Sequence, residues 1–175
     1  MVMVTVTVTV RVRVMKPEPL LWHQLSKVMG PFWHAQRHEE ASGAKGVPDA
    51  SFGMFGVNGW IELKTIEGWP KNPNKIVEIK HFTAEQKLWM LMRGRAGGNT
   101  WLFLKVENDY LLFDHAGSQE VGKLDKAMLL ACSNSHWAGM PKASELVRIL
   151  APEGEAVVIK AEEERRAKNK LQGLF

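Results

Sequence analysis

Valine alternates with Met, Thr or Arg through residues 1–15. This period of two predicts either an added edge strand or a loosely attached arm. Beyond it, apolar residues return at helical spacing between Leu20 and about Glu40, and those of the first half are Leu21, Leu25, Val28 and Met29. Gly30-Pro31 interrupts this pattern, so we expect either two helices or one kinked helix there.

Strand-like runs follow. Asp49 to Val57 and Trp60 to Ile66 are rich in strand-forming residues, and Asn58-Gly59 between them is typical of a hairpin turn. Ile76 to Lys80 predicts a further short strand. A second hairpin is expected from Thr100–Val106 and Tyr110–Phe113.

Helices are expected between and after these strands. Thr83-Ala84-Glu85-Gln86 has the form of a capping box and opens a helix to about Arg95, with an apolar stripe formed by Leu88, Leu91 and Met92. Residues 120–150 suggest more helix, and 161–170 a charged helix with little to bury. The order helix, three strands, helix, two strands and helices predicts an α/β fold around a mixed sheet.

The length of 175 residues fits one domain with appendages. We divide it into an arm at 1–15, a core at 16–115 and a helical C-terminal extension at 116–175. The net charge of +4 weakly favours an anionic partner. The single cysteine, Cys132, excludes an internal disulfide framework and a thiolate zinc site, so we expect a cytoplasmic setting. No apolar run of about 18 residues predicts a membrane span.

Three charged residues carry the candidate chemistry. Glu62 and Lys64 lie two apart in a predicted strand and share one face. Reflecting the hairpin about Val57-Asn58 puts Asp49 opposite Ile66, on that same face but four residues, about 13 Å, from Glu62. Bulges would then be needed to bring the carboxylates together, and the glycines available for them are Gly53, Gly56 and Gly59.

Two carboxylates held close together repel each other, and a hard divalent cation relieves that repulsion. Such a cation lowers the pKa of a bound water and polarises a phosphate. A neighbouring lysine can orient or deprotonate that water and offset charge on the phosphate. Taken singly, Asp49 is better explained as a turn residue after a proline, and Glu62 and Lys64 as the polar face of a half-exposed strand.

Together, Gly46-Val47-Pro48-Asp49 and Glu62-Leu63-Lys64 resemble the motif of the PD-(D/E)XK nuclease superfamily. The sequence is most similar to phage-type nucleases related to the VRR-NUC and archaeal Holliday-junction resolvase groups. Further matches are Arg37-His38-Glu39, expected near the end of the first helix, Gly59-Trp60-Ile61 and Phe82-Thr83-Ala84-Glu85-Gln86. The resemblance covers roughly residues 32–106 and implies a restriction-endonuclease-like core, with helices around a mixed sheet in αβββαβ order.

The resemblance also implies roles for single residues. Asp49, Glu62 and the carbonyl of Leu63 would bind Mg²⁺, with Mn²⁺ as a substitute, and Lys64 would be the catalytic lysine. Gln86 would contact the bound water or the phosphate, although it is also a plain capping-box residue. A helix carboxylate would supplement the metal site, either Glu39 or, failing that, Glu40.

Basic residues around this centre are expected to contact DNA, and they are Arg37, Lys71, Lys75, His81 and Arg93. The alternative for the lysines is a solvated loop. We therefore expect a Mg²⁺-dependent endonuclease acting on DNA in phage replication, recombination or repair, with branched DNA such as Holliday junctions as a candidate substrate. Resolvases of this fold act as dimers, so a homodimer is plausible.

Two alternatives stay open. One is a structure-specific DNA-binding protein that keeps the fold without cutting. The other is an interaction protein, which would be favoured if Asp49 and Glu62 lay far apart. The choice between DNA and RNA depends on pocket shape and sugar contacts and is not encoded in any motif.

Overall fold

The computed structural model describes residues 17–38 and 46–172. Residues 1–15, predicted to be a strand or an arm, therefore lie outside the described part of the chain. The helices and strands follow in the order α1 (Pro17–Met29), η1 (Gly30–Phe32), β1 (His34–Arg37), β2 (Ala50–Met54), β3 (Val57–Ile66), α2 (Ala84–Arg95), β4 (Asn99–Val106), β5 (Asp109–Phe113), η3 (Gly117–Gln119), α3 (Lys126–Cys132), β6 (Ser135–Ala138), α4 (Ala143–Leu150), η4 (Pro152–Gly154) and α5 (Glu155–Gln172).

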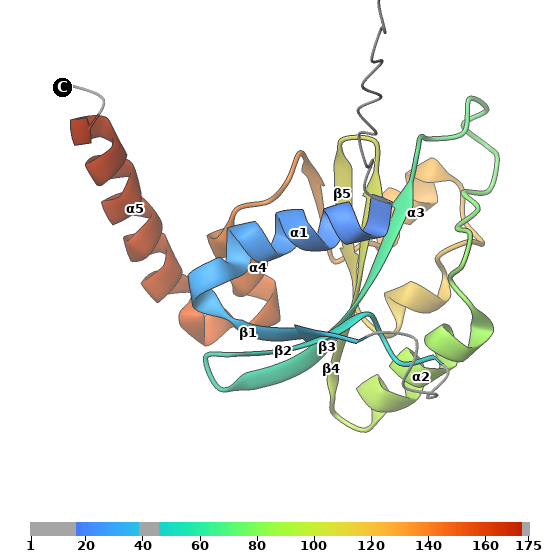
Figure 1. Cartoon of the computed structure of the whole chain (residues 1–175). Coiled ribbons are helices and arrows are strands. Elements are labelled where there is room, and N and C mark those ends of the chain that lie inside the picture. Colours follow the sequence, from blue (N-terminus) through green and yellow to red (C-terminus); the bar gives the residue numbers. More distant parts are fainter. Residues whose placement is uncertain (1–16, 39–45, 173–175) are drawn as a thin grey trace, which may run out of the picture.

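One mixed sheet organises these elements (Figure 1). Its strands are arranged in the order β1-β2-β3-β4-β5-β6. Neighbouring strands are antiparallel except β3 and β4, which are parallel and connected through α2. A parallel pair needs such a crossover, because the chain must return to the starting edge. The α/β class, the mixed sheet and the αβββαβ order of the first six helices and strands are confirmed.

The first of the three leading strands is not the one expected. Residues 34–37 were predicted as helix but form β1, which pairs with β2. The helix that was expected to reach about Glu40 ends at Met29, and Pro31 lies in a 3-10 turn that separates it from the strand. The predicted strand at 76–80 is wrong, since this segment has no regular structure in the fold.

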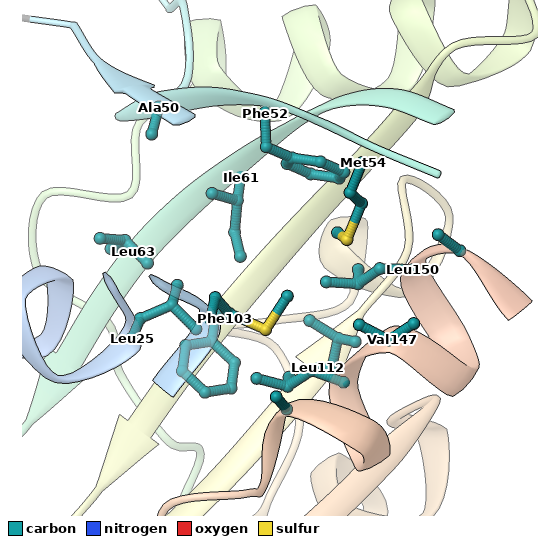
Figure 2. Close-up of a cluster of buried hydrophobic side chains, with 14 of the residues drawn as sticks. Leu25, Ala50, Phe52, Met54, Ile61, Leu63, Phe103, Leu112, Val147 and Leu150 are labelled. Carbon is teal, nitrogen blue, oxygen red and sulfur yellow. The ribbon is translucent and has the colours of Figure 1, made fainter. Parts of the chain in front are cut away.

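Helices pack on both faces of the sheet. Figure 2 shows the first core layer, where strand residues such as Phe103 and Leu63 point toward α1 and α4. Its buried helix residues are Leu21, Leu25, Met29, Ala143, Leu146, Val147, Leu150 and Val158. The second layer lies on the opposite face and includes Met90 of α2 and Leu129 of α3. Alternate residues of β4 serve the two layers, as the pleat of a strand requires.

Helix α2 begins as predicted and packs differently. Thr83 is its N-cap and Gln86 completes the capping box, which confirms the start of the helix. The apolar stripe is wrong, because Met90 is fully buried while Leu88 and Met92 are mostly exposed. Gln86 therefore lies on the side of the helix that faces the sheet.

The C-terminal part contributes a strand as well as helices. β6 was not predicted, and it pairs with β5 at the edge of the sheet. The charged helix is confirmed and is longer than expected, running as α5 away from the sheet (Figure 1). No helix in the described part of the chain is long and apolar enough to cross a membrane.

Candidate functional site

The β2–β3 hairpin sets the positions of the candidate carboxylates. Its turn lies at Phe55-Gly56, both at positive φ (46° and 81°), and not at Asn58-Gly59 as predicted. Ala50 consequently pairs with Ile61, and one residue further along Asp49 lies beside Glu62. The expected four-residue offset is wrong, and the register needs no bulge to bring the carboxylates together.

Backbone groups hold the two carboxylates against each other. The Asp49 N–H donates to Glu62 Oε2 at 3.2 Å, and the Leu63 N–H donates to Asp49 Oδ2 at 2.8 Å. The His38 N–H donates to the carbonyl of Asp49 at 2.7 Å, so β1 also supports this end of β2. These three bonds fix Asp49 where β2 begins, at the border of the sheet.

Lys64 forms a buried ion pair with Glu62. Its Nζ lies 2.6 Å from Glu62 Oε1, and the two residues are 4% and 0% exposed. The pKa of Glu62 is raised to about 7, because burial and, after it, the neighbouring Asp49 carboxylate raise it more than Lys64 lowers it. For Lys64, burial is the largest single effect and lowers the pKa, but the ion pair with Glu62 and the carboxylates of Asp49 and Glu18 together outweigh it, so the net pKa is raised.

Gln86 connects the start of α2 to the same carboxylate. Its Oε1 accepts a hydrogen bond from the Thr83 N–H at 3.0 Å, as the capping box requires. Its Nε2 donates to Glu62 Oε1 at 2.6 Å. Because the cap fixes which end of the amide faces the helix, the other end is left to donate toward Glu62. The capping role and the contact with the site therefore coexist.

The backbone of Leu63 is turned toward the carboxylates. Its N–H bonds Asp49, and in an extended strand the carbonyl of a residue points to the same side as its N–H. β2 pairs with β3 only as far as Ile61, so the Leu63 carbonyl lies beyond the end of that ladder. It is therefore placed where an oxygen ligand would be useful.

Sequence reasoning missed Glu18. Its Oε1 lies 3.9 Å from Lys64 Nζ, which makes it a second carboxylate beside that lysine. We expected helical spacing only from Leu20 onward, whereas Pro17 is the first residue of α1 and Glu18 lies in its first turn. A proline followed by an acidic residue is a typical helix start, and this signal was available in the sequence.

Comparisons with known proteins add little. No family model matches the chain, and no curated protein does. Among solved structures, Hjc from Archaeoglobus fulgidus, a Holliday junction resolvase, is similar with a TM-score of 0.41 and 16% identity, over 57% of this chain and 77% of that one. An overlap this loose supports no conclusion about chemistry.

The remaining residues predicted for the site lie further from the carboxylates or outside the described part of the chain. Glu39 and Glu40 fall within the undescribed residues 39–45. Arg37, at the end of β1, is not at the end of a helix as predicted. The other basic residues are all exposed, and they are Lys71, Lys75, His81 and Arg93. Among them, Arg93 has a defined contact, its Cζ lying 4.3 Å from the centre of the Trp60 ring.

The donor set suits a hard cation. The described residues contain no group of three or more His, Cys, Asp or Glu side chains able to hold a metal. The site instead offers the carboxylates of Asp49 and Glu62 and the carbonyl of Leu63, all oxygen ligands. Such a set fits Mg²⁺, which keeps several of its waters, and it does not fit zinc.

Proposed function

We propose that this protein is a Mg²⁺-dependent endonuclease that hydrolyses phosphodiester bonds in DNA. The observation that carries the proposal is the juxtaposition of Asp49 and Glu62 across the β2–β3 pair, with Lys64 Nζ 2.6 Å from Glu62. Two carboxylates, a buried lysine and an amide donor then meet at the border of one sheet. The same residues carry the sequence resemblance to PD-(D/E)XK nucleases.

Asp49, Glu62 and the Leu63 carbonyl would hold the metal, with Glu18 or Glu39 as a supplementary carboxylate. When bound, Mg²⁺ or Mn²⁺ would activate a water and polarise the phosphate. It would also relieve the repulsion that contributes to the raised pKa of Glu62.

Lys64 would act on the reacting groups, and Gln86 would support Glu62, both from fixed positions. The Lys64 ammonium, held between Glu62 and Glu18, orients the attacking water and offsets negative charge on the phosphate. Gln86 keeps Glu62 in place through its amide, and that amide is itself oriented by the helix cap. Preorganisation of this kind lowers the barrier, because the groups need not reorient during the reaction.

Branched DNA, such as a flap or a four-way junction, is the proposed substrate, and replication, recombination or repair in a phage-infected cell is the proposed setting. Both follow from the resemblance to phage-type nucleases. A homodimer belongs to the same proposal, and sedimentation of the purified protein tests it directly.

Cleavage of labelled duplex, single-stranded, flap and four-way-junction DNA tests the activity, with Mg²⁺, Mn²⁺ or EDTA. Asp49→Asn keeps an acceptor for the Leu63 N–H but removes the charge, and Lys64→Ala removes the ammonium. We expect each variant to lose at least about 100-fold in rate. Lys160→Ala, an exposed lysine of α5, is the matched control and should cut normally.

Two results would contradict the proposal. One is cutting by Asp49→Asn and Lys64→Ala at the parental rate, and the other is cutting that persists in EDTA. Tight, salt-sensitive binding without cleavage would instead identify a structure-specific DNA-binding protein on the same fold.

A further inference from the structure

A groove of about 360 Å³ runs over the exposed face of β1, β2 and β3. Its polar lining comes from alternate residues of the three strands, and these are His34, Gln36, Ser51, Asn58 and Trp60. Gly53 lies in register between His34 and Asn58, so the floor has no side chain at its centre. The absence of a side chain at Gly53 therefore deepens the groove, and hydrogen-bonding groups line it.

This groove lies on the same face of the sheet as the candidate site. Ser51 lies two residues from Asp49 on β2, and Trp60 lies two residues from Glu62 on β3, so all four side chains share one face of the sheet. From Glu62 to Asn58 the strand rises about 13 Å, which matches the rise of about four nucleotides along one DNA strand. A strand cut beside Glu62 has room to continue along the groove.

Helix α2 forms a wall beside it. Gln86, Trp89 and Arg93 lie three and four residues apart and so share one face of the helix. Gln86 meets Glu62, and one turn later the Trp89 ring lies 5.6 Å from Trp60, edge to face. Arg93 follows after another turn and covers Trp60, at 4.3 Å from the ring centre.

Arg93 is held in this position by its surroundings. A Cβ added to Gly98 would lie 2.9 Å from Arg93 Nε and 3.0 Å from Cγ, so the side chain fills the space that a larger residue would need. The residue is nevertheless exposed. A planar cation fixed over an indole presents its outer face to a further flat ring.

We infer that the groove binds unpaired nucleotides next to the scissile phosphate, with a base stacked on the Arg93–Trp60 pair. The position of the scissile phosphate rests on the proposed function. Bases in a duplex stack on their neighbours, so a stacking surface of this kind serves unpaired bases. Gln36, Ser51 and Asn58 supply hydrogen-bonding groups for base edges or sugars.

The test measures binding without cleavage. The full-length protein in EDTA is titrated into a fluorescein-labelled single strand of about eight nucleotides, and into an abasic strand of the same length and charge, with anisotropy as the readout. We expect Arg93→Ala to weaken binding of the normal strand about 10-fold more than binding of the abasic strand. Gly98→Ala, which displaces Arg93 but keeps its charge, should reduce the same difference.

Arg95→Ala is the matched control. It removes the same charge from the same helix, about 200° around the axis from Arg93, and should weaken both strands alike and only slightly. The inference is overturned if Arg93→Ala lowers the affinity for both strands equally, because the residue would then act only as a positive charge. Circular dichroism and the thermal midpoint show whether each variant is folded.

These outcomes are separate from those of the proposed function. If the parent protein does not cut DNA, but its binding depends on the bases and Arg93→Ala loses this dependence, the nucleotide-binding role of the groove is supported and the nuclease proposal fails. If the parent cuts DNA and Arg93→Ala leaves the base dependence unchanged, the nuclease proposal stands and the groove is refuted.

Discussion

Glu62 is the residue whose charge depends most strongly on its surroundings. It is fully buried, next to Asp49, and has an amide and an ammonium on the same oxygen. Without a bound metal ion, ionising it buries a second negative charge beside Asp49, and the Lys64 ammonium offsets this only in part. The geometry that suits metal binding therefore lowers the stability of the metal-free protein.

This cost predicts a pH dependence. The folded-state pKa of about 7 is above the ordinary value of 4.5, so the folded protein holds the Glu62 proton more tightly than the unfolded chain does. The resulting stabilisation is complete below about pH 4.5 and is lost as the pH rises through about 7. For this group the loss is about 3 kcal/mol.

Glu62→Gln cannot ionise, so its unfolding free energy should not fall with rising pH through this group. Urea unfolding in EDTA between pH 5 and pH 8 measures the unfolding free energy of both proteins, and the variant should become more stable relative to the parent as the pH rises. The comparison cancels other titrating groups, including the histidines. Parallel stability curves for the two proteins would show that Glu62 does not titrate in this range.

The residues of the candidate site and their order could be predicted from the sequence, because the motif that contains them consists of short local segments. Asp49, Glu62, Lys64 and Gln86 do meet in the fold. Glu18 was missed because its role depends on how α1 packs along β3, which no spacing within α1 reveals.

At the scale of elements, the hairpin shows why the turn was misplaced. Asn-Gly is the stronger local turn signal, but Gly59 lies inside β3, where a Cβ would come within 2.4 Å of the Phe52 ring. Phe55, in the observed turn, packs so closely on Gly154 that a Cβ added to Gly154 would clash with the Phe55 ring. Contacts with residues far along the chain therefore decide where the chain reverses.

Gly56 is needed for this turn because of its positive φ. Gly56→Ala meets no atom within 4 Å but adds a side chain at φ 81°, so we expect a loss of about 1 kcal/mol in unfolding free energy. Gly30→Ala, equally free of neighbours and without a positive φ, should cost less. Chemical denaturation of both variants checks this, and equal losses would mean that φ is not the cause.

The short strands β1 and β6 were missed for a related reason. Each has four residues, and neither has the alternation of apolar and polar side chains that marks a strand. They become strands because an edge of the sheet is available to pair with them. The fold class was predictable from the order of the longer elements, whereas these edge strands were not.

On the scale of the whole molecule, the C-terminal part shares its core with the rest. α4 and α5 supply Leu146, Val147, Leu150 and Val158 to the layer that also contains α1 and the sheet. Figure 2 labels Val147 and Leu150 of this group. β6 belongs to the same sheet as the candidate site. Residues 116–158 are therefore packed into the structure that positions the carboxylates.

Cooperative unfolding is the expected consequence. Leu146→Ala should lower the unfolding free energy by about 2–5 kcal/mol, because it leaves a cavity at a fully buried position. The loss should appear as a shift of one transition, with tryptophan fluorescence and circular dichroism coinciding. Two separate transitions, with only the first one shifted, would show that the C-terminal part unfolds independently.

The amide of Gln86 has one further consequence. One end of it closes the first turn of α2 and the other supports Glu62. Helix ends fray, and each opening of this turn withdraws a hydrogen bond from the carboxylate at the same moment. Opening of this one helical turn and loosening of the charged cluster are thus one event, so the site is only as well ordered as the first turn of α2.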